Sequence, residues 1–165
     1  QDEFEALPIA RSGNLDTTLD SDTATPRYIG RAFGQQQNFD VLIRKAKIEF
    51  QLKHYEDAYA LFLEAEQIQA LVGPECIEAA LSASALLHSS DSHEICGDAI
   101  RRWTEITEIG PGMGNANSWA ERAAVEMFNG MIAQSIKSAN RSIEIDTTNG
   151  RAREILDAID MSSRP

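Results

Sequence analysis

The 165-residue chain has the composition of a folded helical protein. Its hydrophobic fraction is 42%, while aromatic residues make up 7%. This length suffices for one domain with a sizeable core or for several short stacked repeats, and few aromatics with many alanines favour close helix packing over a β-sandwich. The net charge of −11 argues against a nucleic-acid partner, since phosphate binding needs clustered Lys and Arg. It is compatible with a neutral or basic protein partner, or with a charge kept for solubility alone. No apolar run approaches the roughly 18 residues of a membrane helix, so we expect no membrane insertion.

Residues 1–37 differ in composition from the rest of the chain. Ser, Thr, Asp, Gly and Gln dominate from Arg11 to Gln37, and neither a helical nor an alternating period persists. Such a segment buries too little apolar surface to fold alone. Its apolar residues occur singly, which predicts an extended arm that inserts one side chain at a time into a partner or into the chain's own groove. The expected arm contacts are Phe4, Leu7, Ile9, Tyr28 and Phe33.

A first helical hairpin is predicted over residues 38–72. Asn38 is the expected N-cap of a helix whose apolar side holds Phe39, Leu42, Ile43, Ala46 and Phe50. A second helix is expected from about Tyr55 to Leu71, because Gly73-Pro74 is a strong stop signal.

Two further hairpins and a last helix are predicted after residue 74. The hairpin over 75–109 has a polar loop, a capping box at Asp91 and Glu94, and packing positions at Cys96, Ala99, Trp103 and Ile106. The hairpin over 118–146 is expected to begin with a capping box of Ser118 and Glu121 and to turn at Asn129-Gly130. Residues 150–161 are predicted to form a solvent-facing helix that caps the stack.

The stretch 46–66, AKIEFQLKHYEDAYALFLEAE, resembles a tetratricopeptide repeat (TPR), a helix–turn–helix unit of about 34 residues. Small and large residues stand where this unit needs them, at Ala46, Tyr55, Ala58, Phe62 and Ala65, although Lys53-His54 replaces the usual glycine of the turn. The resemblance covers roughly residues 39–161. It implies an all-α solenoid of three stacked antiparallel hairpins plus a capping helix over residues 38–161, preceded by the arm. It also implies a protein-interaction scaffold or assembly subunit, with no catalysis, no cofactor and no metal.

The resemblance further implies a concave groove, lined by the first helix of each hairpin, that binds an extended peptide or a partner helix. Carried over by spacing, the groove residues are Asp40, Ile43, Lys47, Phe50, Gln51, Asn117, Ala120, Ala124, Met127 and Phe128. Family members that bind acidic tails use Lys, Asn and Arg at these places, whereas Ile43, Asn117 and Glu121 occupy three of them here. We therefore expect an apolar or mixed ligand. Core roles for Phe50, Met127 and Phe128 are the alternative.

A metal or thiol site is the competing functional interpretation. His93 and Cys96 are one helical turn apart and, with His88 and Asp91, are candidate ligands of a metal ion. Alternatively, Cys96 and His93 are candidates for a nucleophile and its base. Either arrangement would make the chain a small metal- or thiol-dependent enzyme or sensor.

The two cysteines and the first residue bear on the compartment. Cys76 and Cys96 are expected roughly 15 Å apart, at opposite ends of a hairpin, which is too far for a disulfide. Free buried thiols are typical of a reducing, cytoplasmic compartment. A chain that begins at Gln1 is instead compatible with signal-peptide removal, so export to a compartment such as the periplasm is the first expectation and the cytoplasm the alternative.

Overall fold

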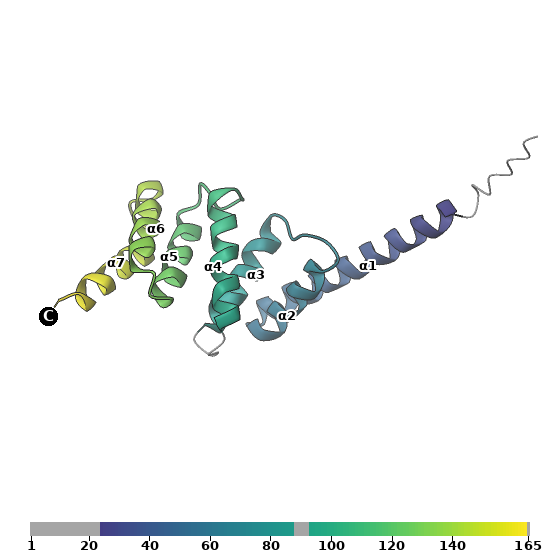
Figure 1. Cartoon of the computed structure of the whole chain (residues 1–165), viewed down its shortest axis with the longest axis horizontal. Helices are drawn as coiled ribbons and strands as arrows, with labels where there is room; N and C mark the ends of the chain where they lie inside the picture. The colour runs from purple at the N-terminus through teal and green to yellow at the C-terminus, as the bar shows by residue number, and fades with distance from the viewer. Residues whose placement is uncertain (1–23, 88–92, 165) are drawn as a thin grey trace, which may run out of the picture.

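The computed structural model describes residues 24–87 and 93–164, with side chains from residue 34 onward, and every regular element in these ranges is a helix. Figure 1 shows the helices following one another along the long axis of the molecule. They are α1 (Ala24–Gln51), α2 (Tyr55–Glu66), α3 (Pro74–Leu86), α4 (His93–Glu108), α5 (Ala116–Phe128), α6 (Ile132–Ile145) and α7 (Gly150–Ser162). None of the helices described is long and apolar enough to cross a membrane.

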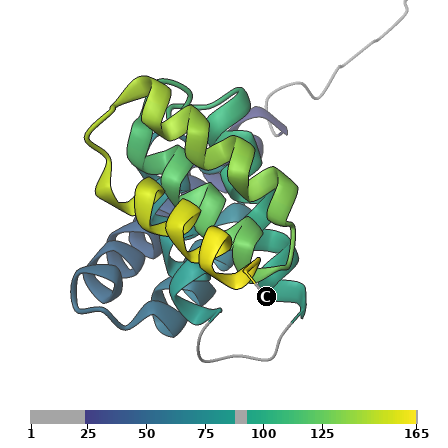
Figure 2. The same cartoon turned by 90° about the vertical axis from the view of Figure 1, so that its left-hand side faces the viewer.

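Consecutive helices pair into three antiparallel hairpins, α1–α2, α3–α4 and α5–α6, and each hairpin packs on the next through α2–α3 and α4–α5 contacts. The last helix, α7, packs against both α5 and α6, as the end view in Figure 2 shows. The predicted all-α stack of hairpins with a capping helix is therefore confirmed.

Small residues permit the close helix crossings of the first hairpin. Ala46, Ala58, Phe62 and Ala65 are all fully buried, in one cluster that α3 completes with Ala79. In the second hairpin the predicted packing positions Cys96, Ala99, Trp103 and Ile106 are likewise buried. In both hairpins, buried alanines surround one large aromatic side chain, Phe62 or Trp103. Small alanine side chains let the helices approach closely, and the space that remains between them is filled by the aromatic ring.

The start of α1 corrects the predicted boundary between arm and repeats. The helix begins at Ala24, and Asn38 lies inside it instead of capping it. Gln, Arg and Ala are good helix formers, and Pro26 stands in the first turn, where proline is tolerated. Tyr28 and Phe33 therefore belong to α1, not to an extended arm. The other predicted arm contacts, Phe4, Leu7 and Ile9, lie outside the described residues.

Two further helix boundaries differ from the prediction. The second helix ends at Glu66 and not near Leu71. Residues 67–73 form an irregular connection that leads to Pro74 at the start of α3. The N-cap of α5 is Asn115, whose side chain accepts hydrogen bonds from the backbone N–H groups of Asn117 and Ser118. The predicted capping box at Ser118 is wrong, since Ser118 is buried within the first turn. The box at Asp91 lies outside the described residues.

The α1–α2 turn reaches a glycine-type conformation without glycine. Lys53 has φ +64°, and the amides of Lys53 and His54 donate to the carbonyls of Phe50 and Glu49, at 3.0 and 2.9 Å. This is the Schellman arrangement that ends many helices. Gly130, with φ +72°, ends α5 with the same pair of hydrogen bonds.

Candidate partner-binding cleft

A cleft opens on the side of the stack formed by α3, α5 and α7. α1 contacts α3 and α5 contacts α7, whereas α3 and α5 have no comparable contact in the described part of the chain, because α4 packs against both. The space between them is a pocket of about 310 Å³. Its lining is Ser84 and Leu87 from the end of α3, Glu121, Ala124, Val125, Met127 and Phe128 from α5, and Arg151, Glu154, Ile155 and Ala158 from α7.

The floor of this cleft is apolar and well anchored. Leu87, Val125 and Ile155 are 5%, 2% and 5% exposed, so their packing belongs to the core. Phe128 stands at the edge and is 50% exposed. An accessible aromatic ring beside a fixed apolar floor suits an incoming apolar side chain, because binding there removes apolar surface from water on both sides.

Within the described part of the chain, the one cation of the cleft lining, Arg151, is already paired. Arg151 faces Glu121 through two contacts, Nε to Oε1 at 2.7 Å and Nη2 to Oε2 at 3.0 Å. These two contacts hold the guanidinium of Arg151 against the carboxylate of Glu121. Glu154, the remaining charged residue of the lining, is exposed and forms no ion pair within the described ranges. The rim therefore carries a net negative charge.

Three of the predicted groove residues, Ala124, Met127 and Phe128, line this cleft. The other two predicted from the third unit do not. Ala120 is fully buried in the cluster that joins α5, α6 and α7, and Asn117 accepts a 2.9 Å hydrogen bond from the side chain of Asn149, the N-cap of α7.

The predicted groove residues of the first hairpin do not share one environment. Ile43 is buried at 8% exposure, and Phe50 is half-buried with its ring edge-on to Tyr55. Lys47 forms a 2.6 Å ion pair with Glu75 of α3, and this hydrogen bond raises the pKa of Lys47. Asp40 and Gln51 are exposed. The single lysine expected to face a ligand thus already has an internal partner.

Sequence reasoning missed the contribution of α7 to the cleft and named no groove residue of α3. It treated residues 150–161 as a cap, although Arg151, Glu154 and Ala158 recur at helical spacing on the side of α7 that borders the pocket. That periodicity was the available signal. The spacing of α3 and α5, which creates the cleft, depends on how α4 packs between them and has no local signature.

The alternative site at residues 88–96 is only partly described, since His88 and Asp91 lie outside the described residues. Cys96 is buried and its thiol donates a hydrogen bond to Oδ1 of Asn129, while His93 is exposed. Both cysteines are free, as expected, and burial raises the pKa of Cys76. The buried thiol is thus held by α5 and its following turn, an environment that suits packing.

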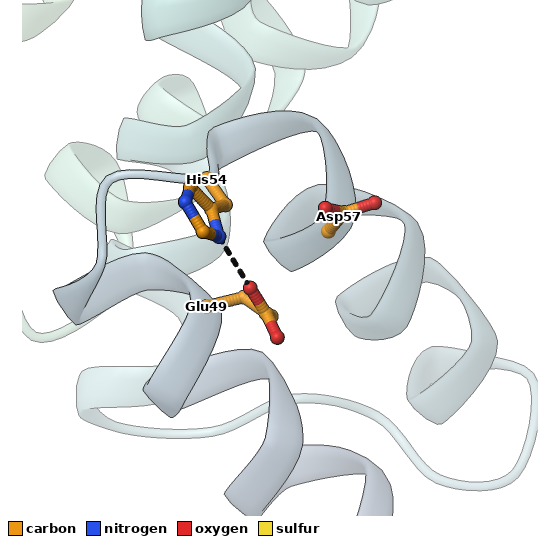
Figure 3. A group of neighbouring side chains, drawn as sticks. All are labelled: Glu49, His54 and Asp57. Atoms are coloured by element: carbon orange, nitrogen blue, oxygen red, sulfur yellow. Dashed lines mark hydrogen bonds and ion pairs between the residues drawn. The ribbon is translucent and has the colours of Figure 1, made fainter.

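A different set of possible metal ligands lies at the α1–α2 turn. The ligand atoms of Glu49, His54 and Asp57 are within 4.8 Å of one another (Figure 3). His54 Nδ1 lies 2.8 Å from Glu49 Oε2, and the backbone of the same two residues is joined by the turn hydrogen bond. His54 and Asp57 are exposed. The local turn accounts for the arrangement.

Comparison with solved structures identifies the type of helical architecture. The structure matches the first TPR domain of Spaghetti (RPAP3) bound to the HSP90 peptide SRMEEVD, with a TM-score of 0.54 and 16% sequence identity over 76% of this chain and 93% of that one. The fold is a TPR-like helical repeat. No protein-family model matches the sequence, and no curated protein matches it either. Within this TPR-like fold, the resemblance assigns α1, α3 and α5, the first helices of the three hairpins, to the concave groove, and α7 packs beside α5.

Proposed function

We propose that this TPR-like chain is a non-catalytic protein-interaction module that binds a segment of a partner protein in the cleft between α3, α5 and α7. The half-exposed ring of Phe128 beside the buried apolar floor is the observation that carries the proposal. A TPR-fold structure bound to a peptide, that of RPAP3, supports peptide binding by this architecture.

The charges at the rim indicate which segment the cleft accepts. The peptide in the RPAP3 structure contains two Glu and one Asp. In the present chain Arg151 is paired with Glu121 and Lys47 with Glu75, while Glu154 forms no ion pair with any described residue. An acidic tail would meet net negative charge at the cleft. The ligand we propose is therefore a segment with an apolar anchor residue and neutral or basic neighbours.

Selection from a phage-displayed random peptide library on the full chain tests this function. We expect enriched peptides to share an apolar residue and to lack acidic neighbours. Phe128→Ala should weaken their binding about tenfold or more, because the loss of an aromatic side chain that packs on the ligand commonly costs over about 1.4 kcal/mol.

Met113→Ala is the matched control, since Met113 is 51% exposed but does not line the cleft. Thermal unfolding of both variants separates loss of binding from loss of fold. Peptides that bind Phe128→Ala and wild type equally, or enrichment of acidic peptides, would contradict the proposal.

A further inference from the structure

The outer face of α1 carries a second apolar stripe. Ile43, Ala46 and Phe50 on the inner face pack against α2 and α3. On the opposite side Val41 is 48% exposed, Ile48 is 54% exposed and Leu52, in the turn after the helix, is 57% exposed. At 3.6 residues per turn these three positions fall along one line of the helix. Figure 1 shows α1 at the end of the stack, and among the described helices it packs against α2 and α3.

This face lies in a positively charged segment of an otherwise acidic chain. Residues 24–53 contain six Lys or Arg and two Asp or Glu, a net charge of +4, whereas residues 54–165 contain eight against eighteen, a net charge of −10. Arg44 and Lys45 flank the stripe, are exposed and form no ion pair within the described ranges. The outer face of α1 is therefore both apolar and cationic, which selects an acidic, apolar occupant.

Residues 1–23 have the complementary composition. They contain six Asp or Glu and one Arg, a net charge of −5. Their apolar residues are spaced singly among these acids and include Phe4, Leu7, Ile9, Leu15 and Leu19. This segment joins α1 directly at Ala24, so it is present at high effective concentration beside the stripe.

Residues 1–23 are also long enough to reach along α1 as far as Leu52. Leu52 lies 28 residues beyond Ala24, which is about 42 Å along a helix at 1.5 Å per residue. Twenty-three residues span up to about 76 Å when extended, at roughly 3.3 Å per residue. Ser12-Gly13-Asn14 and Asp20-Ser21-Asp22 supply turn-forming residues at which the chain can reverse.

We propose that residues 1–23 bind in cis along the outer face of α1, with apolar side chains on Val41, Ile48 and Leu52 and acidic ones near Arg44 and Lys45. A second copy is a poorer occupant of this stripe, because the same face would bring Arg44 and Lys45 of both copies together. An anionic membrane is disfavoured by the net charge of −10 on the remainder of the chain. This contact is separate from the cleft and does not depend on its function.

Limited trypsin digestion of the full chain tests the proposal. Arg11 is the one Lys or Arg among residues 1–23, so release of the fragment 1–11 reports how often the segment is undocked. We expect Ile48→Glu and Lys45→Glu each to speed this cleavage about fivefold or more, and added salt to speed it in the wild type. Met161→Glu, which changes a 66% exposed residue of α7, should leave the rate unchanged.

Circular dichroism of each variant verifies that α1 is formed. A wild-type rate equal to that of Ile48→Glu would overturn the proposal. Protection of Arg11 that increases with protein concentration would overturn it as well, because the occupant would then be the segment of a second copy.

Discussion

The guanidinium of Arg102 in α4 lies against the carboxylate of Glu66 at the end of α2, with 2.6 Å between Nη2 and Oε2. Arg102 is only 4% exposed, and its Nε also contacts Oδ2 of Asp98 at 2.5 Å. Burial by itself would lower the pKa of Arg102, but the hydrogen bonds that it donates to Glu66 and Asp98 outweigh burial, and the pKa is raised. This ion pair ties the first hairpin to the second.

Removing the buried charge should therefore loosen the junction between these hairpins. We expect Arg102→Met to lower the free energy of unfolding by about 3 kcal/mol, because it leaves Glu66 partly buried without its ion-pair partner and removes one of the two arginines that pair with Asp98. Arg101→Met is the control, since Arg101 is exposed and its ion pairs with Asp98 and Glu105 are worth about 1 kcal/mol or less. Urea unfolding measures both, and equal losses would contradict the assignment.

The hydroxyl of Tyr59 in α2 donates a 2.8 Å hydrogen bond to Asp98 and extends the same network. Burial and this hydrogen bond raise the pKa of Tyr59 to about 12. An acid whose pKa is higher in the folded state binds its proton more tightly there, so its contribution is complete below about pH 10 and is lost as the pH rises towards 12.

Stability should consequently fall between about pH 10 and pH 12 by more in the wild type than in Tyr59→Phe. Urea unfolding of the two proteins across this range isolates the tyrosine from other groups that titrate there. A difference in unfolding free energy that stays constant with pH would show that Tyr59 is not held in this way.

The left-handed conformation of Lys53 predicts a stabilising substitution. Lys53→Gly should raise the free energy of unfolding by about 1 kcal/mol, because a non-glycine residue with φ near +60° is strained. Gly130→Lys, at the equivalent position of α5, should lower it by a similar amount. Thermal unfolding compares the two, and a destabilised Lys53→Gly protein would refute the strain argument.

The close crossing of α1 and α2 predicts intolerance of larger side chains at two alanines. Ala58→Leu and Ala65→Leu should each cost about 1–3 kcal/mol, because both positions are fully buried. Ala60→Leu, on the exposed side of the same helix, should have little effect. Unchanged thermal midpoints for all three variants would argue against the repeat packing.

Periodic features were predictable from the sequence, and features that join distant residues were not. The helical spacing of Ala58, Phe62 and Ala65 was sufficient to predict that they are buried. The ion pair of Arg102 with Glu66 joins residues 36 positions apart, and neither residue carries a hydropathy signal. Glu126 is 1% exposed although it is acidic, because Arg122 and Ser138 hold its carboxylate at 2.8 and 2.7 Å.

Helix ends were harder to predict than helix interiors, because several residues can cap and only tertiary packing selects one. Asn115 caps α5, whereas Ser118 also had a glutamate three residues later. Only part of the cleft lining was predictable from the sequence, again because tertiary packing determines the rest. Met127 and Phe128 follow from family spacing, but the part that α7 contributes depends on how the last helix packs against α5.

The most direct test of the proposed partner-binding function is amide NMR of the isotopically labelled full chain, titrated with a peptide obtained by selection. We predict that the largest shifts fall on Ala124, Phe128 and Arg151 around the cleft. The second apolar pocket, of about 280 Å³ with Val72 and Ile109 in its lining, should be unaffected. Shifts centred on Val72 and Ile109, with Phe128 unmoved, would contradict the account.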